Sequence, residues 1–422
     1  MLKYVSAAEA VQLIKSDDKV FIHSAAATPE YLVQAMIGRA SELRNVNIYH
    51  IHTEGNCDYA SEKYAENFKV HAFFNGSNIR HAKNNHVGAS YIPIFLSDIP
   101  HLFYNGKVQL DVAMVQLTPP DAHGMCSLGP SVDVTISALN TAKKIIAQIN
   151  PLLPRTFGEQ IHFSKITKAV LHEAPLFQSK ITENSKVEMA IGHNIANLIE
   201  DGSTLQLGIG NIPNAVLSIL GNHKDLGIHT EMFSDGIVDL YKRGVITGRY
   251  KKKHPRKIVS SFVIGTQKVY DFINDNTEVL LLDCSYTNNP TIISNNPKVV
   301  AVNSAIEIDL SGQVCSDSIG SRIYSGVGGQ MDFIRGAALS AGGKPIIAIP
   351  SKTSNGESKI VPFLKPGAGV VTTRAHVHYI VTEYGHANLH GLTLEERSKA
   401  LVSIAAPEHR EWLEKKFYEL WV

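Results

Sequence analysis

The local signals in the first half of the chain return, in the same order, in its second half. Each half opens with a serine followed three residues later by a glutamate, at 6–9 and 185–188, and this pattern predicts a capping box at the start of a helix. An apolar strand, a turn that ends in proline, a second helix and a second strand follow in both halves. The triplet His-Thr-Glu comes next, at 52–54 and at 229–231. We interpret this order as a degenerate internal duplication, which restricts the chain to two related domains of one fold class.

Short apolar runs alternate with segments that have the apolar spacing of helices. In the first half, for example, the strand signal "KVFIHS" (19–24) precedes the helical segment "EYLVQAMIGRA" (30–40). Strands that alternate with helices predict βαβ units, and therefore an α/β fold with mostly parallel sheets. The polar stretch 172–185 is the best boundary between the halves. We predict one α/β domain at 1–180 and a second, related α/β domain at 181–422.

The composition indicates a soluble globular enzyme. Apolar residues make up 44% of the chain and charged residues 19%, and the net charge of +1 provides no basic field for nucleic acid. The four cysteines form no C-x-x-C pair, which favours a reducing compartment. The N-terminus does not have the pattern of a cleaved signal, and no apolar run approaches the roughly 20 residues that cross a bilayer. We therefore expect a cytoplasmic protein with neither nucleic acid nor a membrane as partner.

The first triplet lies among residues that bind metals in other proteins. His50, His52 and Glu54 would share one face of a strand, and Cys57 follows closely, so a metal site is conceivable. The second copy, however, has Gly227 where the first histidine would stand, and no other half of a ligand set is evident. The pattern favours a packed strand end, and we predict no metal.

Two glycine-rich stretches are candidates for ligand binding. In "LGIGNIP" (207–213) two glycines follow an apolar strand and precede a helix start, whose free N–H groups suit anionic oxygen. A tight structural turn explains this stretch equally well, because it lacks the full dinucleotide and P-loop patterns. The stretch "YSGVGGQMDFIRGA" (324–337) has more glycines than a strand or helix interior tolerates, which favours a backbone that passes close to another group. We interpret the basic run 251–257 as a solvated loop and not as a phosphate clamp.

Seven long segments carry a resemblance to a known family. They are "VQLTPPDAHGMCSLG" (115–129), "AQINPLLPRTFGE" (147–159), "EDGSTLQLGIGNIPNAV" (200–216), "GIHTEMFSDGIVDL" (227–240), "VNSAIEIDLSGQV" (302–314), "GVGGQMDFIRGA" (326–337) and "VTEYGHANLHG" (381–391). Together they closely resemble the acetyl-CoA hydrolase/transferase family, the group of family I CoA-transferases that includes 4-hydroxybutyrate, butyryl-CoA:acetate and succinyl-CoA:acetate CoA-transferases. The resemblance covers nearly the whole chain, and it implies a CoA-transferase-like fold with the active site between the halves.

The resemblance also implies roles for particular residues. Glu231, in the second triplet, matches the nucleophile of the family, and Asn288 looks like the asparagine that helps to hold the thioester carbonyl. The positions that match CoA-binding residues are Gly208, Ile209, Gly210, Asn211, Ile212, Ile306, Gly328, Gly329 and Lys352. The sequence departs from the motif of this family at Gly248 in "GVITG", because the family motif ends in asparagine at this position.

The implied reaction moves CoA between carboxylates and conserves the thioester, so that it needs no ATP, metal or prosthetic group. An ordinary glutamate titrates at about 4.3, so Glu231 is ionised at neutral pH and needs no general base, unlike a serine nucleophile. Attack on an acyl-CoA gives an anhydride, then a glutamyl-CoA thioester, and ping-pong kinetics follow. The first triplet lacks the "MFSDG" that follows Glu231, so we interpret Glu54 as a structural echo that could still border the acid pocket.

Two other functions stay open at this point. The same glutamyl intermediate supports acyl-CoA hydrolysis when water replaces the second acid. A CoA- or nucleotide-sensing protein without turnover is a different class, against which an intact Glu231 beside two glycine loops argues. For the acid pair, acetate is the best guess for one partner, with butyrate, 4-hydroxybutyrate, succinate or propionate as the other. The family resemblance implies a homodimer or homotetramer.

Overall fold

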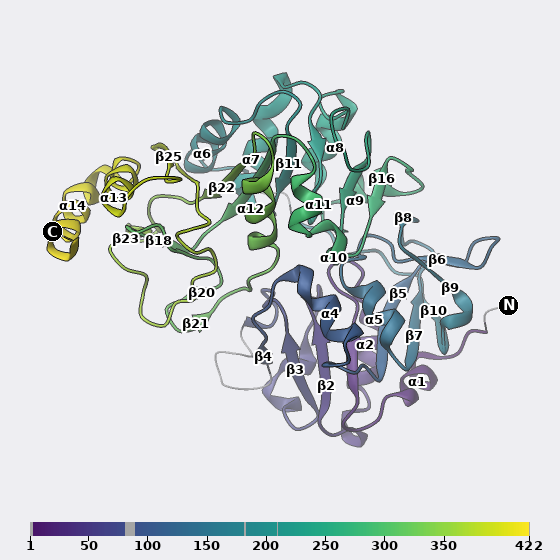
Figure 1. Cartoon of the computed structure of the whole chain (residues 1–422). Coiled ribbons are helices and arrows are strands. Elements are labelled where there is room, and N and C mark those ends of the chain that lie inside the picture. Colours follow the sequence, from purple (N-terminus) through teal and green to yellow (C-terminus); the bar gives the residue numbers. More distant parts are fainter. Residues whose placement is uncertain (1–2, 81–88, 181–182, 209, 422) are drawn as a thin grey trace. The chain divides into compact units, whose positions relative to one another are not determined.

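The structure is a computed structural model that describes residues 3–80, 89–180, 183–208 and 210–421 (Figure 1). The chain forms two compact units. The first comprises 1–180 together with 259–287, and the second comprises 181–258 together with 288–422.

The first unit is built on a seven-stranded sheet in the order β10-β7-β5-β1-β2-β3-β4. All of its strand pairs are parallel. The strands are β1 (Lys19–Ile22), β2 (Val46–His50), β3 (Phe68–Ala72), β4 (Ala89–Tyr91), β5 (Val112–Leu117), β7 (Lys144–Ile149) and β10 (Lys168–Leu171). The helices among and around them are α1 (Ala7–Ala10), α2 (Glu30–Ile37), α4 (Ile99–Tyr104) and α5 (Thr135–Thr141). Every residue of the central strand β5 is buried, as expected for a parallel strand that is covered on both faces.

The second unit is built on a six-stranded sheet in the order β12-β11-β17-β22-β24-β25, in which only the last pair is antiparallel. The strands are β11 (Thr204–Leu207), β12 (Gly227–Ile228), β17 (Val299–Ser304), β22 (Lys344–Ala348), β24 (Tyr379–Thr382) and β25 (Gly385–Asn388). The helices are α6 (Lys186–Ala196), α7 (Asn211–Ile219), α8 (Asp235–Lys242), α11 (Pro290–Ser294), α12 (Gln330–Leu339), α13 (Leu394–Ser403) and α14 (Pro407–Trp421). The α/β class with mostly parallel sheets is therefore confirmed.

The two units share a five-stranded core with one topology. The order β10-β7-β5-β1-β2 in the first unit has its counterpart in β24-β22-β17-β11-β12 in the second, and every neighbouring pair in both is parallel. The helix starts also correspond, because the side chains of Ser6 and Ser185 each accept a hydrogen bond from the backbone N–H three residues later. The repeated order of signals in the sequence thus has a structural equivalent.

The predicted domains are the consecutive segments 1–180 and 181–422. In the structure, the segment 259–287 packs with the first unit instead of the second. In this segment β16 (Val279–Leu281) pairs in parallel with β8 (Phe157–Gly158), and Tyr270 of α9 (Gln267–Ile273) donates a hydrogen bond to the carbonyl of Phe177 at 2.7 Å. A Cβ atom on Gly158 would lie 2.0 Å from the carbonyl oxygen of Leu281, so this approach requires glycine. Such pairing joins residues more than a hundred positions apart, and local periodicity does not reveal it.

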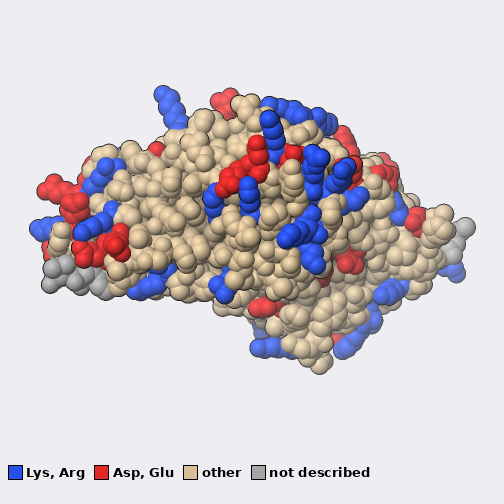
Figure 2. All heavy atoms as spheres, turned by 45° about the horizontal axis from the view of Figure 1, so that its top comes forward, with Lys and Arg blue, Asp and Glu red and all other residues tan. Residues whose placement is uncertain are grey.

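The described part of the chain has no helix that is both long and apolar enough to cross a bilayer. On the face drawn in Figure 2, positive and negative side chains occur side by side among large areas of other residues. This mixture agrees with the net charge of +1.

Candidate active site

The predicted site residues of the second unit gather at the carboxyl edge of its sheet. Gly208 follows β11, Glu231 follows β12, Ile306 follows β17 and Lys352 follows β22. These four strands are neighbours and run parallel, so the loops after them meet at one edge. In open α/β sheets this edge is where ligands bind.

The second triplet is held by the strand beside it. The backbone N–H of His229 donates to the carbonyl of Leu205 at 3.1 Å, and the Thr230 hydroxyl donates to the carbonyls of Leu207 (3.2 Å) and Met232 (2.9 Å). Both side chains are buried, whereas Glu231 is partly exposed. The triplet therefore presents one carboxylate at the sheet edge on a fixed backbone.

A buried lysine fixes the same strand from the other side. Lys251 is 3% exposed, and its Nζ donates to the carbonyls of Ile228 and Lys257, each at 2.6 Å. Burial lowers the pKa of Lys251 to about 7. A Cβ atom on Gly227 would lie 2.7 Å from Lys251 Cγ, which explains why the second copy has glycine at this position. The interpretation of the basic run as a solvated loop is therefore wrong for its first residue.

Asn288 is the hydrogen-bond partner of the candidate nucleophile. Its Nδ2 donates to Glu231 Oε2 at 2.9 Å and to Asp332 Oδ2 at 3.3 Å. Asn288 is fully buried and Asp332 is 4% exposed, so the bond between them is shielded from water, whereas the bond to the partly exposed Glu231 is only partly buried. The two carboxylates fix the orientation of the amide, because only its nitrogen can donate to them. Sequence reasoning missed Asp332, although it stands three residues after Gly329 in the same glycine-rich motif.

Gly329 closes the site from the start of α12. A Cβ atom on this residue would lie 1.9 Å from Glu231 Oε2 and 2.2 Å from Asn288 Nδ2. The preceding Gly328 has a φ of +57°, which also favours glycine. The structure thus brings together three of the predicted residues, namely Glu231, Asn288 and Gly329, from distant parts of the sequence.

The first glycine loop has open space around it. Gly208 and Gly210 have nothing within 4 Å of where a Cβ atom would be, and Gly210 has φ +119° and ψ −176°, a conformation that only glycine adopts readily. Helix α7 begins directly after it, at Asn211, whose side chain donates to Glu188 at 2.8 Å. Ile212 is buried, and the predicted contact Ile209 lies outside the described residues. The open loop and the helix N-terminus could accept an anionic group.

The remaining predicted positions have other partners in this structure. Ile306 is half-buried, and its backbone N–H donates to the carbonyl of Cys315 at 2.8 Å. Lys352 forms a hydrogen-bonded ion pair with Glu408, which raises the pKa of the lysine. Gly248 has a φ of +60°, a conformation that asparagine adopts more readily than most residues, so the departure from the family motif is compatible with one backbone shape.

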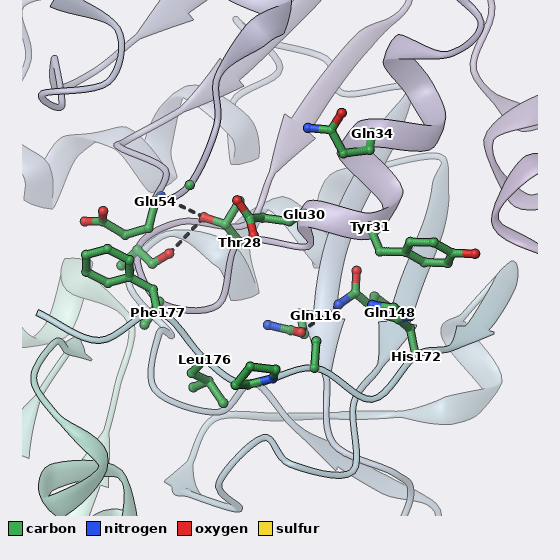
Figure 3. A pocket seen from close by; sticks show the side chains of 15 residues that line it. Thr28, Glu30, Tyr31, Gln34, Glu54, Gln116, Gln148, His172, Leu176 and Phe177 are labelled. Atoms are coloured by element: carbon green, nitrogen blue, oxygen red, sulfur yellow. Dashed lines mark hydrogen bonds between the residues drawn. The ribbon is translucent and has the colours of Figure 1, made fainter.

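The first triplet borders a cavity in the first unit. The cavity has a volume of about 430 Å³, and Glu54 lies on its wall (Figure 3). His52 Nε2 is 3.8 Å from Glu54 Oε1, but burial lowers the pKa of His52, so the histidine is neutral at neutral pH and the contact is not an ion pair. His50 is fully buried, with neither ring nitrogen hydrogen-bonded among the described residues. The described residues contain no cluster of three or more side chains that could hold a metal ion.

The comparisons with known proteins cover nearly the whole chain. The family model described as Acetyl-CoA hydrolase/transferase N-terminal domain matches residues 1–191, and that of the C-terminal domain matches residues 265–417. The chain is 53% identical, over 97% of its length and 87% of the other protein, to the succinyl-CoA:acetate/propanoyl-CoA:succinate CoA transferase of Fasciola hepatica. It is 46% identical, over 98% and 97%, to the 4-hydroxybutyrate coenzyme A transferase of Clostridium kluyveri. The crystal structure of 4-hydroxybutyrate CoA-transferase from Porphyromonas gingivalis has a TM-score of 0.84 and 38% identity, covering 99% of this chain and 97% of that one.

The geometry at Gly329 predicts a selective loss of activity. In Gly329→Ala the new methyl group would displace the ends of the Glu231 and Asn288 side chains, which can move, so the fold should persist. Displacing a reacting group by about 1 Å costs about a hundredfold in rate, and we expect a loss of at least that size in turnover, with an unchanged unfolding temperature. Gly38→Ala is the control, because its Cβ atom would approach backbone oxygens only to 3.4 Å. A fully active Gly329→Ala enzyme would contradict this account of the loop.

The hydrogen bond from Asn288 predicts a positioning role for Asp332. Asp332→Ala removes the acceptor that orients the amide, and we expect roughly a tenfold slower reaction of Glu231, since an ordinary hydrogen bond has about this effect on an equilibrium. Asp332→Asn keeps an acceptor oxygen and should recover most of the rate. It loses the negative charge in the first turn of α12, which stabilises the N-terminal end of that helix. Single-turnover kinetics and the CoA dissociation constant would be measured together. Equal defects in the two variants, or a defect confined to CoA binding, would count against the positioning role.

Burial raises the pKa of Glu54 to about 7, which predicts a pH-dependent stability. A folded-state pKa above the ordinary value of 4.5 means that the folded protein loses stability as the pH rises from about 4.5 to about 7. Glu54→Gln should therefore unfold at a temperature about 2 °C above the wild type at pH 8, and the difference should vanish near pH 4.5. Thermal unfolding across this range tests the sign. The exposed Glu62→Gln should give no such trend.

Proposed function

Since the chain belongs to the acetyl-CoA hydrolase/transferase family, we propose that it is a CoA-transferase that moves CoA from a short-chain acyl-CoA to a carboxylic acid. The observation that carries the proposal is the Glu231 carboxylate, which is in hydrogen-bond contact with Asn288 and lies against the backbone of Gly329. A protein that only binds CoA has no use for a carboxylate held in this way.

The proposed reaction proceeds through two covalent intermediates on Glu231. The carboxylate attacks the thioester carbonyl of the acyl-CoA, which forms an acyl-glutamyl anhydride and releases CoA thiolate. The thiolate then attacks the glutamyl carbonyl, which forms a glutamyl-CoA thioester and releases the acyl group as its carboxylate. A second carboxylate enters and the same steps run in reverse, so that no net proton transfer is needed and the kinetics are ping-pong.

Asn288 is suited to the second of these steps. Its Nδ2 lies 2.9 Å from Glu231 Oε2, and this oxygen becomes negatively charged when the thiolate adds to the glutamyl carbonyl. A preorganised donor at this distance stabilises an oxyanion, and the loss of one such donor costs roughly 3–4 kcal/mol in other acyl-transfer enzymes. The amide therefore contacts the ground-state carboxylate and can follow it through the transition state.

The substrates in this proposal are CoA thioesters and short carboxylic acids, with acetate as one acid and without a prosthetic group. The open loop at Gly208 and Gly210 and the start of α7 would receive an anionic part of CoA. Hydrolysis is the alternative outcome on the same intermediate. The proposal also includes a cytoplasmic homodimer or homotetramer, which fractionation and light scattering would test.

The central test compares the two triplets in one assay. With an acyl-CoA and no acceptor acid, we expect a CoA adduct on the peptide that contains Glu231, measured by mass spectrometry. Glu231→Ala should abolish both the adduct and CoA exchange. Glu231→Asp should retain about a hundredth of the rate, because it withdraws the carboxylate by one methylene. An adduct on another residue would contradict the assignment of Glu231 as the nucleophile.

Glu54→Ala is the matched control for this assay, because Glu54 ends the other copy of the same triplet. It should still form the adduct. Adding acetate then distinguishes CoA transfer from hydrolysis of the glutamyl-CoA thioester. A transferase yields acetyl-CoA, whereas a hydrolase yields free CoA at the same rate with or without acetate.

A further inference from the structure

A cavity of the second unit lies at the edge of the sheet opposite the candidate active site. It has a volume of about 450 Å³, and its lining residues include Asp201, Gly202, Lys224, Asp225, Tyr250 and Lys298. Most of them come just before β11, β12 and β17, three neighbouring parallel strands. Gly208 follows β11 at the other edge, and the six residues of largely extended chain from Gly202 to Gly208 span about 20 Å. The cavity is therefore distinct from the candidate active site.

Tyr250 presents an aromatic ring to this cavity. A Cβ atom on Gly202 would lie 3.0 Å from Tyr250 Cδ2, so one side of the ring rests on the glycine backbone. The tyrosine is nevertheless 54% exposed, which leaves the rest of its ring open. An aromatic ring that is supported on one side and open on the other can stack with a second planar ring.

The backbone around Tyr250 is anchored on both sides. The next residue is the buried Lys251, whose Nζ donates to two backbone carbonyls at 2.6 Å. Before the tyrosine, the Thr247 hydroxyl donates to Asp225 Oδ1 at 2.9 Å and accepts a hydrogen bond from the backbone N–H of Arg249 at 3.2 Å. The exposed ring is thus carried by a fixed segment, as binding residues on a preorganised site are.

The cavity wall has a cation that no carboxylate neutralises. Lys224 is exposed and forms no ion pair with any residue that the structure describes. Lys298 lines the same cavity, and its Nζ lies 2.8 Å from Glu200 Oε2. Glu200 is also 2.6 Å from Lys344, so this one carboxylate is shared between two lysines. Ammonium groups placed in this way can bind a phosphate group.

Two aspartates of the wall differ in what they can still bind. Asp225 accepts a hydrogen bond from Thr247 and lies 3.9 Å from an Arg249 nitrogen. Asp201 Oδ1 accepts from the backbone N–H of Lys224 at 2.8 Å, whereas its Oδ2 has no partner in the described part of the chain. A carboxylate oxygen accepts hydrogen bonds from hydroxyl groups and repels phosphate. The wall therefore has an acceptor for hydroxyl groups next to a cation for phosphate.

We propose that this cavity binds a nucleotide, with the base stacked on Tyr250. The ribose hydroxyls lie at Asp201, and the phosphate lies at Lys224 and Lys298. A planar ring, neighbouring hydroxyls and a phosphate are the three groups that the wall can recognise, and a nucleotide carries all three. The volume of about 450 Å³ is in the range of small-molecule sites. Because the cavity lies at the edge opposite Glu231, a nucleotide there and CoA at the candidate active site bind independently.

Isothermal titration calorimetry on the full chain tests the proposal, with AMP, adenosine and ribose 5-phosphate as probes. We expect AMP to bind, and the other two to bind at least tenfold more weakly, because each lacks one recognised group. AMP is titrated both without CoA and with an excess of CoA, and the two dissociation constants should agree. No binding of AMP, equal binding of the three probes, or competition between AMP and CoA would overturn the proposal.

A substitution of the tyrosine assigns the ring contact. Tyr250→Ala should weaken AMP binding about tenfold, the usual effect of losing one stacked ring, and leave the binding of ribose 5-phosphate unchanged. Tyr104→Ala is the control, because Tyr104 is equally exposed at 54% and belongs to the first unit. Thermal unfolding would check that both variants are folded. Unchanged AMP binding in a folded Tyr250→Ala protein, or an equal loss in Tyr104→Ala, would contradict the assignment.

A substitution of the lysine assigns the phosphate contact. Lys224→Gln keeps the length of the side chain approximately and removes its charge, so it should reduce the preference for AMP over adenosine severalfold. Lys107→Gln is the matched control, because Lys107 is an exposed lysine of the first unit. If folded Lys224→Gln protein retained the full preference for AMP, or if Lys107→Gln lost as much of it, the proposed phosphate position would be wrong.

Discussion

The contact among Glu231, Asn288 and the backbone of Gly329 is the constraint on which the candidate active site depends. A carboxylate and an amide nitrogen lie so close to Gly329 that any side chain there would displace them. Three segments of the second unit therefore have to meet at this point, namely the loop after β12, the residue two positions before α11 and the start of α12. A parallel sheet meets this requirement, because its strands fix the loops at one edge and buried groups such as Thr230 and Lys251 fix the strand next to the nucleophile.

The two His-Thr-Glu triplets have different surroundings, although the two units that carry them share a core. Glu231 has an amide donor at 2.9 Å, and that amide is oriented by a second carboxylate. Glu54 has a neutral histidine at 3.8 Å, and burial raises its pKa to about 7, so a large fraction of it is protonated at neutral pH. A protonated carboxyl group is a poor nucleophile but a usable hydrogen-bond donor. The five-stranded core is common to both units, and the difference lies in the loops at the carboxyl ends of the strands.

The sequence predicts the sheets well, because alternating apolar strands and amphipathic helices have a local signature, as in 19–24 followed by 30–40. It also predicts that Gly329 lies close to another group, since clustered glycines have few other uses. It did not reveal that 259–287 packs with the first unit, because that depends on the pairing of β16 with β8. The sequence also has a signal at Gln116 and Gln148, one polar residue in each of the apolar runs "VAMVQL" (112–117) and "IIAQI" (145–149), but only the register of β5 and β7 shows that these two residues lie opposite each other.

The reaction proposed for this fold places an unusual demand on specificity. Both acids in a CoA exchange present the same carboxylate to the same nucleophile, so the reacting end cannot distinguish them. Discrimination has to come from the tail, and an apolar pocket separates tails that differ by one methylene only weakly.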